Sequence, residues 1–283
     1  MNAPVAGLPG LDRALVMGVV NVTPDSFSDG GRFDSTDAAV KRGLALVTDR
    51  ADLLDIGGES SRPGAEPVTA EEEQRRVLPV ITALAQAGVV ISVDTVRAST
   101  AELALDAGAA IVNDISGGTF DPDLPRLVAD RQVPYVVMHS RGPSATMLQR
   151  AVYDDVVEDV LRELGERMAA VMAAGVAEDR IVLDPGIGFA KDADQSWALL
   201  NALPRLRALG RPVLVGASRK TFLGRLLAAP DGTVRPVDER DDASLAVAAI
   251  AARDGAWAVR VHEAGPAADA VRVAARLRRE DGS

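Results

Sequence analysis

Short apolar runs rich in Val, Ile and Leu recur along the chain, and each is followed by Gly, Ser or Asp and then by a segment with helical spacing. Runs that are apolar throughout, without alternation, are typical of parallel strands buried on both faces. We therefore predict eight strands. They begin at Leu15, Leu53, Val89, Ala110, Tyr135, Ile181, Pro212 and Ala258.

The segments between these runs carry apolar residues three or four positions apart, which is the spacing of one helix face. Two such sets are Val40, Leu44, Val47 and Val156, Val160, Leu164, Met168. Thr69 and Glu72 have the spacing of a capping box, which predicts the start of a helix that ends near Ala87.

Eight strand–helix units with no linker or repeat between them predict an α/β fold. We expect one (β/α)8 TIM barrel domain over residues 1–283, with its core from about residue 15 to residue 279. The composition agrees: 47% of the residues are hydrophobic but only 3% are aromatic, so branched aliphatic side chains must fill the core. The first eleven residues are expected to be a loose lead-in, and the final REDGS a frayed end.

Polar residues stand where the predicted strands end. They are Asn21, Asp55, Glu59, Asp94, Asn113, His139, Asp184, Ser218, Arg219, Lys220, Arg260 and His262. A single buried Asp or Asn is most often a satisfied structural group. A barrel, however, brings the carboxyl ends of all its strands to the face where active sites lie, so the whole set predicts a functional site. Long loops after the first, second and fifth strands favour the same face.

The residue types suggest two binding regions. Carboxylates accept paired N–H bonds and a lysine donates to a carbonyl, which suits a flat heterocycle with a guanidine-like edge. The residues of this first set are Asp94, Asn113, Asp184 and Lys220. The second set suits an anion rich in oxygen, such as a diphosphate, and consists of Asn21, Arg62, Arg260 and His262.

The net charge of −10 and the pI near 4.8 argue against non-specific binding to nucleic acid or to an anionic membrane. An anionic substrate therefore needs basic groups that are placed locally, as in the second set. The first twenty residues lack the basic start and apolar stretch of a signal peptide, and no apolar run approaches a membrane span. We expect a cytoplasmic protein.

The chain has two histidines and no cysteine, which disfavours a zinc site and excludes disulfides. His139 follows an apolar strand, and we predict a packed or loop-bonded imidazole. His262 lies two residues after Arg260, so both side chains point to the same side of the strand, and we predict an anion clamp.

A hard cation such as Mg²⁺ typically takes one or two protein oxygens together with substrate phosphates. Asn21, at the strand end, is the preferred ligand, and Asp25 and Asp29 offer further oxygens. Asp25 fits ordinary turn chemistry equally well.

Two other short motifs argue against familiar enzyme classes. The segment DPGIGFAK, Asp184 to Lys191, has neither the dinucleotide fingerprint nor the Walker spacing. The segment GASRK fails the fifth position of GxSxG. Hydride transfer and serine hydrolysis are therefore disfavoured.

Seven segments, taken together, resemble the motifs of the dihydropteroate synthase family of the folate pathway, in the family's order. They are MGVVNVTPDSFSDGG, DIGGESSRPG, SVDTVRA, VNDISGG, LDPGIGFAK, VGASRKTFLG and VRVHE. The resemblance runs from about Met17 to Glu263, and its TPDSFSDGG and SRKTFLG segments are highly specific.

The resemblance implies a sulfonamide-target enzyme that joins 6-hydroxymethyl-7,8-dihydropterin diphosphate to 4-aminobenzoate, giving 7,8-dihydropteroate and diphosphate. At the matching positions, the pterin would be held by Asp94, Asn113, Asp184 and Lys220. Diphosphate and its Mg²⁺ would be held by Asn21, Arg260 and His262, and Phe189 would border the aminobenzoate. Mobile loops would carry Asp25, Asp29, Ser61, Arg62 and Pro63, with Ser61 and Arg62 near the junction of both substrates.

The family mechanism is dissociative: diphosphate leaves first, and the amine captures a pterin methylene cation. The resemblance also implies a homodimer. Two alternatives remain, a methyltetrahydrofolate-binding methyltransferase domain and a catalytically silent pterin-binding paralogue. The TPDSFSDGG loop and the Arg260/His262 pair count against the first, and the presence of Arg62 and Lys220 counts against the second.

Overall fold

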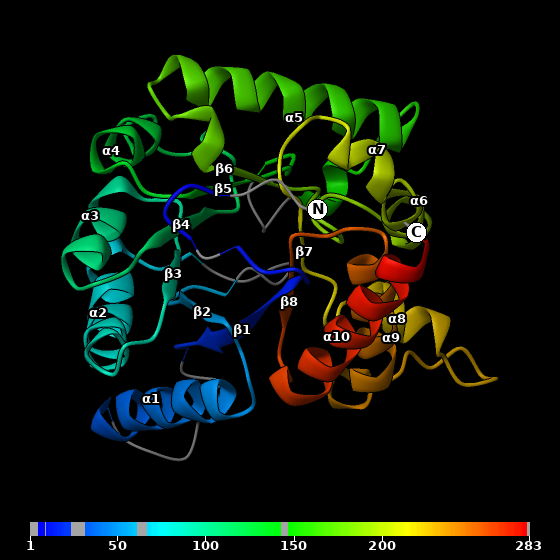
Figure 1. The fold of residues 1–283 in the computed structure, drawn as a ribbon, viewed down its shortest axis with the longest axis horizontal. Coiled ribbons are helices and arrows are strands. Elements are labelled where there is room, and N and C mark those ends of the chain that lie inside the picture. Colours follow the sequence, from blue (N-terminus) through cyan, green and yellow to red (C-terminus); the bar gives the residue numbers. More distant parts are fainter. Residues whose placement is uncertain (1–4, 9, 24–31, 61–66, 143–146, 282–283) are drawn as a thin grey trace.

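A computed structural model describes residues 5–8, 10–23, 32–60, 67–142 and 147–281. Its strands form one parallel sheet in the order β6-β5-β4-β3-β2-β1-β8-β7, surrounded by helices (Figure 1). A parallel bridge between Leu183 and Val213 joins the β6 edge to the segment that leads into β7. The ring of strands is nearly closed by this bridge, and the prediction of a (β/α)8 TIM barrel is confirmed.

All eight predicted strands form. Their bounds are β1 (Leu15–Asn21), β2 (Leu53–Gly57), β3 (Ile91–Asp94), β4 (Ile111–Asp114), β5 (Tyr135–Met138), β6 (Ile181–Asp184), β7 (Leu214–Val215) and β8 (Ala258–Val261). β7 is the shortest, because its first predicted residues, Pro212 and Val213, meet β6 only through the isolated bridge and the bond from Leu183 N–H to the Pro212 carbonyl.

Helices follow the strands and cover the outside of the barrel (Figure 1). They are α1 (Arg32–Thr48), α2 (Ala70–Gln86), α3 (Ala98–Asp106), α4 (Leu124–Arg131), α5 (Val156–Ala173), α6 (Ala193–Asn201), α7 (Leu203–Arg207), α8 (Thr221–Leu226), α9 (Asp241–Arg253) and α10 (Ala264–Asp281). None of the described helices is long and apolar enough to cross a membrane.

The α5 face is confirmed, since Val160 and Leu164 are buried and Val156 and Met168 pack against the core. Helix α2 begins as predicted, where the Thr69 hydroxyl accepts a hydrogen bond from the Glu72 N–H at 3.2 Å. The Glu72 carboxylate, however, pairs with Arg75 and Arg76 instead of returning to Thr69, so only half of the capping box forms.

The predicted apolar face of α1 is wrong for two of its three residues, because Val40 packs against the core but Leu44 and Val47 are 42% and 37% exposed. The helix instead buries Ala39, Gly43 and Leu46. A Cβ on Gly43 would lie 2.8 Å from a Leu84 methyl carbon, so the absent side chain is what lets α1 approach α2 closely. Hydrophobic spacing finds the helix, but a glycine contact gives no hydrophobic signal.

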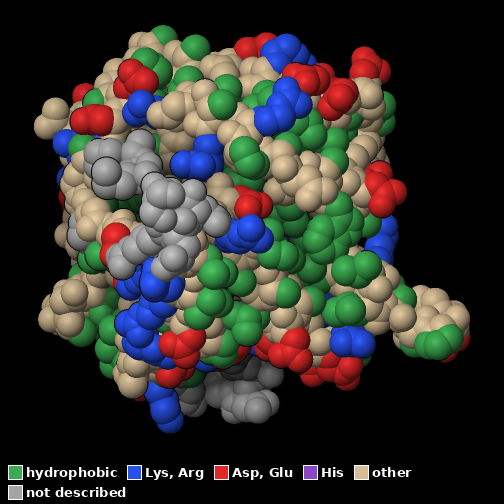
Figure 2. Space-filling model, turned by 45° about the vertical axis from the view of Figure 1, so that its right-hand side comes forward, with side chains coloured by type: hydrophobic (Ala, Val, Ile, Leu, Met, Phe, Trp, Pro, Cys, Tyr) green, Lys and Arg blue, Asp and Glu red, His purple; other side chains and the backbone are tan. Residues whose placement is uncertain are grey.

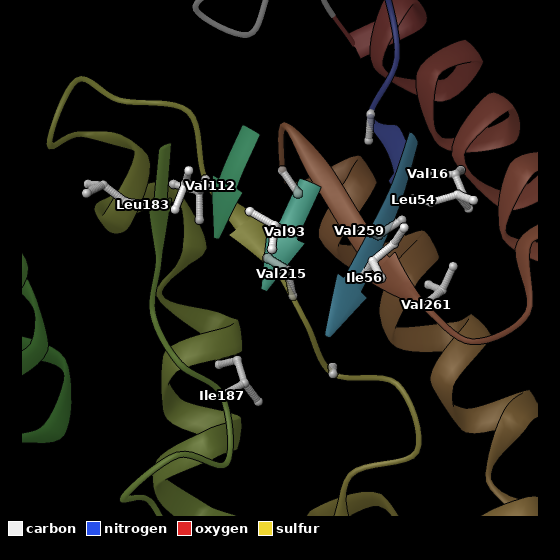
Figure 3. Close-up of a cluster of buried hydrophobic side chains, with 14 of the residues drawn as sticks. Val16, Leu54, Ile56, Val93, Val112, Leu183, Ile187, Val215, Val259 and Val261 are labelled. Atoms are coloured by element: carbon white, nitrogen blue, oxygen red, sulfur yellow. The ribbon is translucent and has the colours of Figure 1, made fainter. Parts of the chain in front are cut away.

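Two apolar clusters form the core. The larger lies between the strands and the helices and contains Leu54 and Ile56 of β2 (Figure 3). The smaller lies inside the barrel and contains Leu53, Met17 and Ile111. Neighbouring β2 residues therefore face opposite sides, as the two-residue period of a strand requires.

The amino-terminal segment is not the expected loose lead-in. Val5 is only 3% exposed and belongs to the interior cluster, and the Ala6 N–H donates to the Asp179 carbonyl at 2.9 Å. Burying a valine side chain contributes about 1.5–3 kcal/mol. The other end also differs, because α10 continues to Asp281, within the segment expected to be frayed.

Replacing Val5 with Asp should therefore lower the free energy of unfolding by at least about 2 kcal/mol, because a carboxylate would enter an apolar cluster. Leu11→Asp, at a position that is 42% exposed, is the matched control and should change stability by less than about 0.5 kcal/mol. Urea unfolding of both variants measures this. If Val5→Asp lowered stability as little as Leu11→Asp, the burial of Val5 would not contribute to the stability of the fold.

Candidate active site

The strand register places several of the predicted site residues in one layer. Asn21 of β1 is opposite Gly57 of β2, which is opposite Asp94 of β3, which in turn is opposite Asn113 of β4. Leu53 lies in the barrel interior, so Asp55 and Gly57 face the interior too, two and four residues further on. The interior thus changes from apolar to polar towards the carboxyl ends of the strands.

An arginine between two aspartates is the centre of the polar layer. The Arg260 Nε–H donates to Asp55 Oδ2 at 2.6 Å, and a terminal N–H of the same guanidinium donates to Asp94 Oδ2 at 2.9 Å. The Asn113 amide also donates to Asp55 Oδ2, at 3.0 Å. Arg260 therefore also contacts the predicted heterocycle set, whereas the sequence assigned it to the anion set alone.

Asp55 is the site residue that sequence reasoning left without a role. Its side chain is fully buried, and its Oδ1 has no hydrogen-bond partner among the described residues. A signal for it did exist, since Asp55 stands two residues after the inward Leu53 in an otherwise apolar strand.

Asp94 lies against Gly57, where a Cβ would come within 3.3 Å of the Asp94 Cβ, so the glycine leaves room for the carboxylate. Burial raises the pKa of Asp94 to about 7; the charge of Asp55 adds to this effect, and Arg260 opposes it. Asp94 can therefore gain or lose a proton near neutral pH.

A turn after β6 forms the next part of the site. Asp184 Oδ1 accepts a hydrogen bond from the Gly186 N–H at 2.7 Å, and burial raises the pKa of Asp184 while Lys220 opposes the shift. The Lys220 ammonium donates to the Ile187 carbonyl and lies 4.4 Å from the centre of the Phe189 ring. Burial lowers the pKa of Lys220 to about 8, with Asp184 acting against it.

His262 follows β8 and faces the loop after β7, where its Nδ1 lies 2.9 Å from Ser218 Oγ. Burial, together with the charges of Arg219 and Arg260, lowers the pKa of His262 to about 3. At neutral pH the imidazole is uncharged. It can donate a hydrogen bond to an anion but brings no positive charge to an anion clamp.

The residue before Lys220 has an unusual backbone. Arg219 has φ of +59°, a conformation that costs a non-glycine residue of order 1 kcal/mol. Its guanidinium is held by both oxygens of Asp241, at 2.6 and 2.7 Å, and its N–H donates to Ser244 Oγ at 2.9 Å. These contacts with α9 hold the backbone that presents Lys220.

His139 is a packed group, as its sequence context predicted. It is fully buried, with Nε2 2.9 Å from Glu163 Oε2 and Nδ1 2.9 Å from the Lys191 ammonium. Through its contact with Lys191, His139 supports the turn after β6.

Some predicted residues cannot be placed. Asp25, Asp29, Ser61, Arg62 and Pro63 lie outside the described residues. Asn21, the predicted Mg²⁺ ligand, is half-buried at the end of β1. Within the described ranges no group of three or more His, Cys, Asp or Glu residues gathers as a metal site. The amide oxygen of Asn21 suits a hard cation that takes its other ligands from a phosphate-bearing substrate.

Comparisons with known proteins agree with this geometry. Residues 17–262 match the family described as pterin binding enzyme. The dihydropteroate synthase of Mycobacterium leprae is 51% identical over 259 residues, which cover 91% of this chain and 91% of that protein. A structure of Xanthomonas albilineans dihydropteroate synthase with 4-aminobenzoic acid has a TM-score of 0.87 at 44% identity and covers 94% of each chain. A Yersinia pestis dihydropteroate synthase with a sulfonamide drug complex has a TM-score of 0.89 at 38% identity and covers 99% of this chain and 100% of that one.

Asp55→Asn should lower the free energy of unfolding by about 3 kcal/mol, because it removes the buried partner charge of the Arg260 guanidinium. The matched control is Asp123→Asn, whose partner Arg126 is exposed, and it should change stability by less than about 0.5 kcal/mol. Urea unfolding compares the two. If Asp55→Asn proved as mild as the control, Arg260 would not depend on Asp55.

Proposed function

Since this chain belongs to the dihydropteroate synthase family of pterin-binding enzymes and is a transferase, we propose that it joins 6-hydroxymethyl-7,8-dihydropterin diphosphate to 4-aminobenzoate by a dissociative reaction. The observation that supports this most is the hydrogen-bonded set of Arg260, Asp94 and Asp55 beside Asn113, which offers paired acceptors and an amide to a flat polar heterocycle. The products are 7,8-dihydropteroate and diphosphate.

In this proposal the pterin binds to Asp94, Asn113, Asp184 and Lys220. The carboxylates accept N–H bonds from its guanidine-like edge, and Lys220 donates to its ring carbonyl. Asp94 and Asp184 also stabilise positive charge that spreads over the ring as the carbon–oxygen bond to diphosphate breaks. No side-chain nucleophile is needed.

The leaving diphosphate is held by Arg260 and His262, which donate hydrogen bonds to its oxygens. Ser218 orients the imidazole of His262 through Nδ1, which leaves Nε2 to donate. Asn21 is the proposed protein ligand of Mg²⁺, which when bound stabilises negative charge on the leaving group. Asp25, Asp29, Ser61, Arg62 and Pro63 are proposed to close over the substrates and keep water from the cation.

The aminobenzoate is proposed to bind beside Phe189 and Lys220, whose contact forms one wall of the pocket. Its amine then attacks the pterin methylene carbon and forms the new carbon–nitrogen bond. The amine loses one proton, and the released diphosphate carries the electron pair of the broken bond.

We also propose that the chain is one barrel domain and forms a homodimer. Support for the dimer comes from exposed apolar residues on neighbouring helices, Ile250 of α9 and Val273 and Leu277 of α10, which are 58%, 61% and 50% exposed. Figure 2 brings the side of α8, α9 and α10 forward and shows hydrophobic side chains gathered there. The other face of α9 packs inward, where Val247, Ala248, Ala251 and Ala252 are buried. A cytoplasmic location stays a prediction from the sequence.

The direct test is diphosphate release by the purified protein from the pterin diphosphate and Mg²⁺, with and without 4-aminobenzoate. We expect release that requires Mg²⁺, and dihydropteroate when the amine is present. Removing Mg²⁺ with a chelator should lower the rate by at least about 100-fold, since a metal clamp contributes several kcal/mol to such a step. Tight pterin binding without either product would instead indicate a catalytically silent paralogue.

Pterin affinity should be highest between pH 7 and 8. Below about 7, Asp94 gains a proton and no longer accepts paired hydrogen bonds, and above about 8, Lys220 loses the proton that gives it a charge. Because a single group titrates on each side of this range, pterin affinity should fall by no more than about tenfold per pH unit. Calorimetry with hydroxymethylpterin avoids the titration of the diphosphate. Lys220→Met should abolish only the alkaline decline, and a flat profile from pH 6 to 9 would contradict both assignments.

A further inference from the structure

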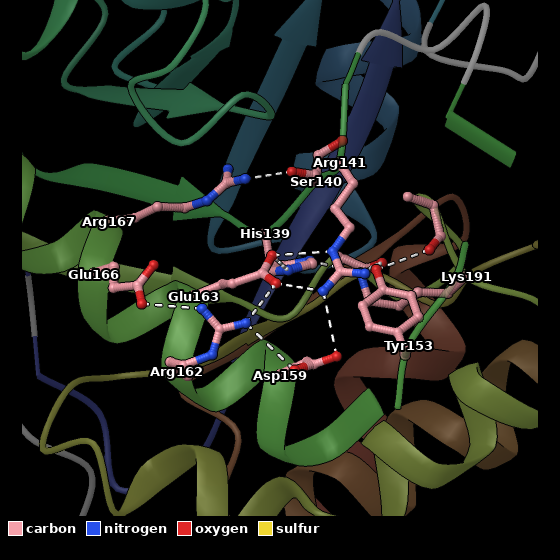
Figure 4. A network of polar contacts seen from close by, with 12 residues as sticks. His139, Ser140, Arg141, Tyr153, Asp159, Arg162, Glu163, Glu166, Arg167 and Lys191 are labelled. Carbon is pink, nitrogen blue, oxygen red and sulfur yellow. Dashed lines mark hydrogen bonds and ion pairs between the residues drawn. The ribbon is translucent and has the colours of Figure 1, made fainter. Parts of the chain in front are cut away.

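Lys191, at the end of the turn that follows β6, is a buried ammonium with no role in the proposed chemistry. It is 3% exposed, and its ammonium donates to His139 Nδ1 at 2.9 Å (Figure 4). It also donates to the Gly186 carbonyl at 3.1 Å and to the Phe189 carbonyl at 2.8 Å. An ammonium has three N–H donors, so each one is used.

The partners of His139 determine the charge of Lys191. Hydrogen bonds from His139 and Arg141 keep the pKa of Glu163 well below its usual range, so Glu163 has no proton to give. His139 must then donate from Nε2 to Glu163 and accept at Nδ1. Burial lowers the pKa of Lys191, with Asp184 opposing, but three acceptors around one nitrogen require the protonated form.

The turn from Gly186 to Ala190 is held largely by side chains. Lys191 binds the carbonyls of Gly186 and Phe189, and Lys220 binds the carbonyl between them, that of Ile187. The Tyr153 hydroxyl donates to the Ala190 carbonyl at 2.9 Å. Only one backbone bond, from the Phe189 N–H to the Gly186 carbonyl at 2.9 Å, lies within the turn.

The backbone conformation of this turn is energetically unfavourable by itself. Ala190 has φ of +50°, in the left-handed region that disfavours residues other than glycine. Gly186 has φ of +64° and packs so closely that a Cβ would lie 2.0 Å from the His139 carbonyl oxygen. External donors must therefore stabilise the turn, and Lys191 supplies two of them.

The use of lysine here is informative. The chain has 31 lysine and arginine residues, and its only lysines are Lys41, Lys191 and Lys220. Lys191, which is buried, and Lys220, which is partly buried, hold this turn from different sides. Three donors that diverge from one small nitrogen suit a lysine, whereas the planar fork of an arginine cannot direct its N–H groups to acceptors arranged in this way.

We propose that Lys191 is a positioning residue for the aromatic amine substrate. It acts through the turn: by fixing the carbonyls of Gly186 and Phe189 it sets the place of the Phe189 ring against Lys220. This inference rests on the proposed function, because Phe189 and Lys220 are the residues proposed to border 4-aminobenzoate. Two of the four residues proposed for the pterin, Asp94 and Asn113, lie outside the turn, whereas Asp184 and Lys220 contact it at Gly186 and Ile187. Pterin binding should therefore depend less on Lys191 than aminobenzoate binding does.

Lys191→Met removes the ammonium and keeps a flexible side chain of similar reach. The KM for 4-aminobenzoate should rise about tenfold or more, since displacing a substrate-positioning group has effects of this size, while the Kd of hydroxymethylpterin should change less than about threefold. Hydrogen exchange should accelerate in the peptide that spans residues 185–191 and stay unchanged in peptides from β3 and β4. Lys41→Met, the same substitution on an exposed part of α1, should alter none of these.

Tyr153→Phe provides a milder variant in case Lys191→Met does not fold, because it removes only the donor to Ala190 and keeps the ring over which Arg141 lies. It should accelerate exchange in the same peptide and raise the same KM by a smaller factor. The proposal is overturned if either folded variant leaves both exchange and KM unchanged, or if pterin and aminobenzoate binding weaken equally. An inactive wild-type protein would refute the proposed function alone, because exchange still reports on the turn.

Discussion

The architecture of the site depends on one partly buried cation, the Arg260 guanidinium, placed between Asp55 and Asp94 inside the barrel. Asp55 has no exposed side-chain surface, and a carboxylate in such a position needs a close positive partner. Arg260 reaches it from β8 across a sequence separation of 205 residues. The contact spans β1, which lies between β8 and β2 in the sheet, and Gly57 leaves space for the carboxylate of Asp94.

Along the axis of the barrel, one part of the interior contributes to stability and another carries the polar groups of the site. The amino ends of the strands enclose Met17, Leu53 and Ile111, and Val5, which precedes β1 in the chain, packs against this cluster. Two residues further along β2 and β4 the same inward direction carries Asp55 and Asn113. Polar groups that are placed together inside a protein lower its stability, and burial of the apolar cluster offsets that cost. The carboxyl ends of the strands, the mouth of the barrel, are thereby left for binding substrates.

Around the mouth, side chains hold backbone that would not keep its shape alone. Arg219 and Ala190 both have left-handed φ, and each is next to a lysine that contacts the turn after β6. Asp241 and Ser244 hold the first, and Tyr153 with Lys191 holds the second. Such conformations persist only where surrounding contacts fix them, and here those contacts come from α9 and from the segment before α5. The two lysines meet the same turn, so the positions of Phe189 and Lys220 are coupled.

The sequence by itself determined the strands, the barrel and the face on which polar residues gather, because apolar runs and helical spacing are local properties that need no knowledge of partners. It also indicated that Arg260 and His262 point the same way, since strand parity is local too. Tertiary structure alone decided which groups pair: Arg260 binds two carboxylates, Asp55 becomes the anchor, and His262 stays neutral through burial. It also decided that α1 packs through Gly43 and that Val5 enters the core. These outcomes depend on contacts between strands and helices that are far apart in the sequence, and neither residue spacing nor composition contains information on such contacts.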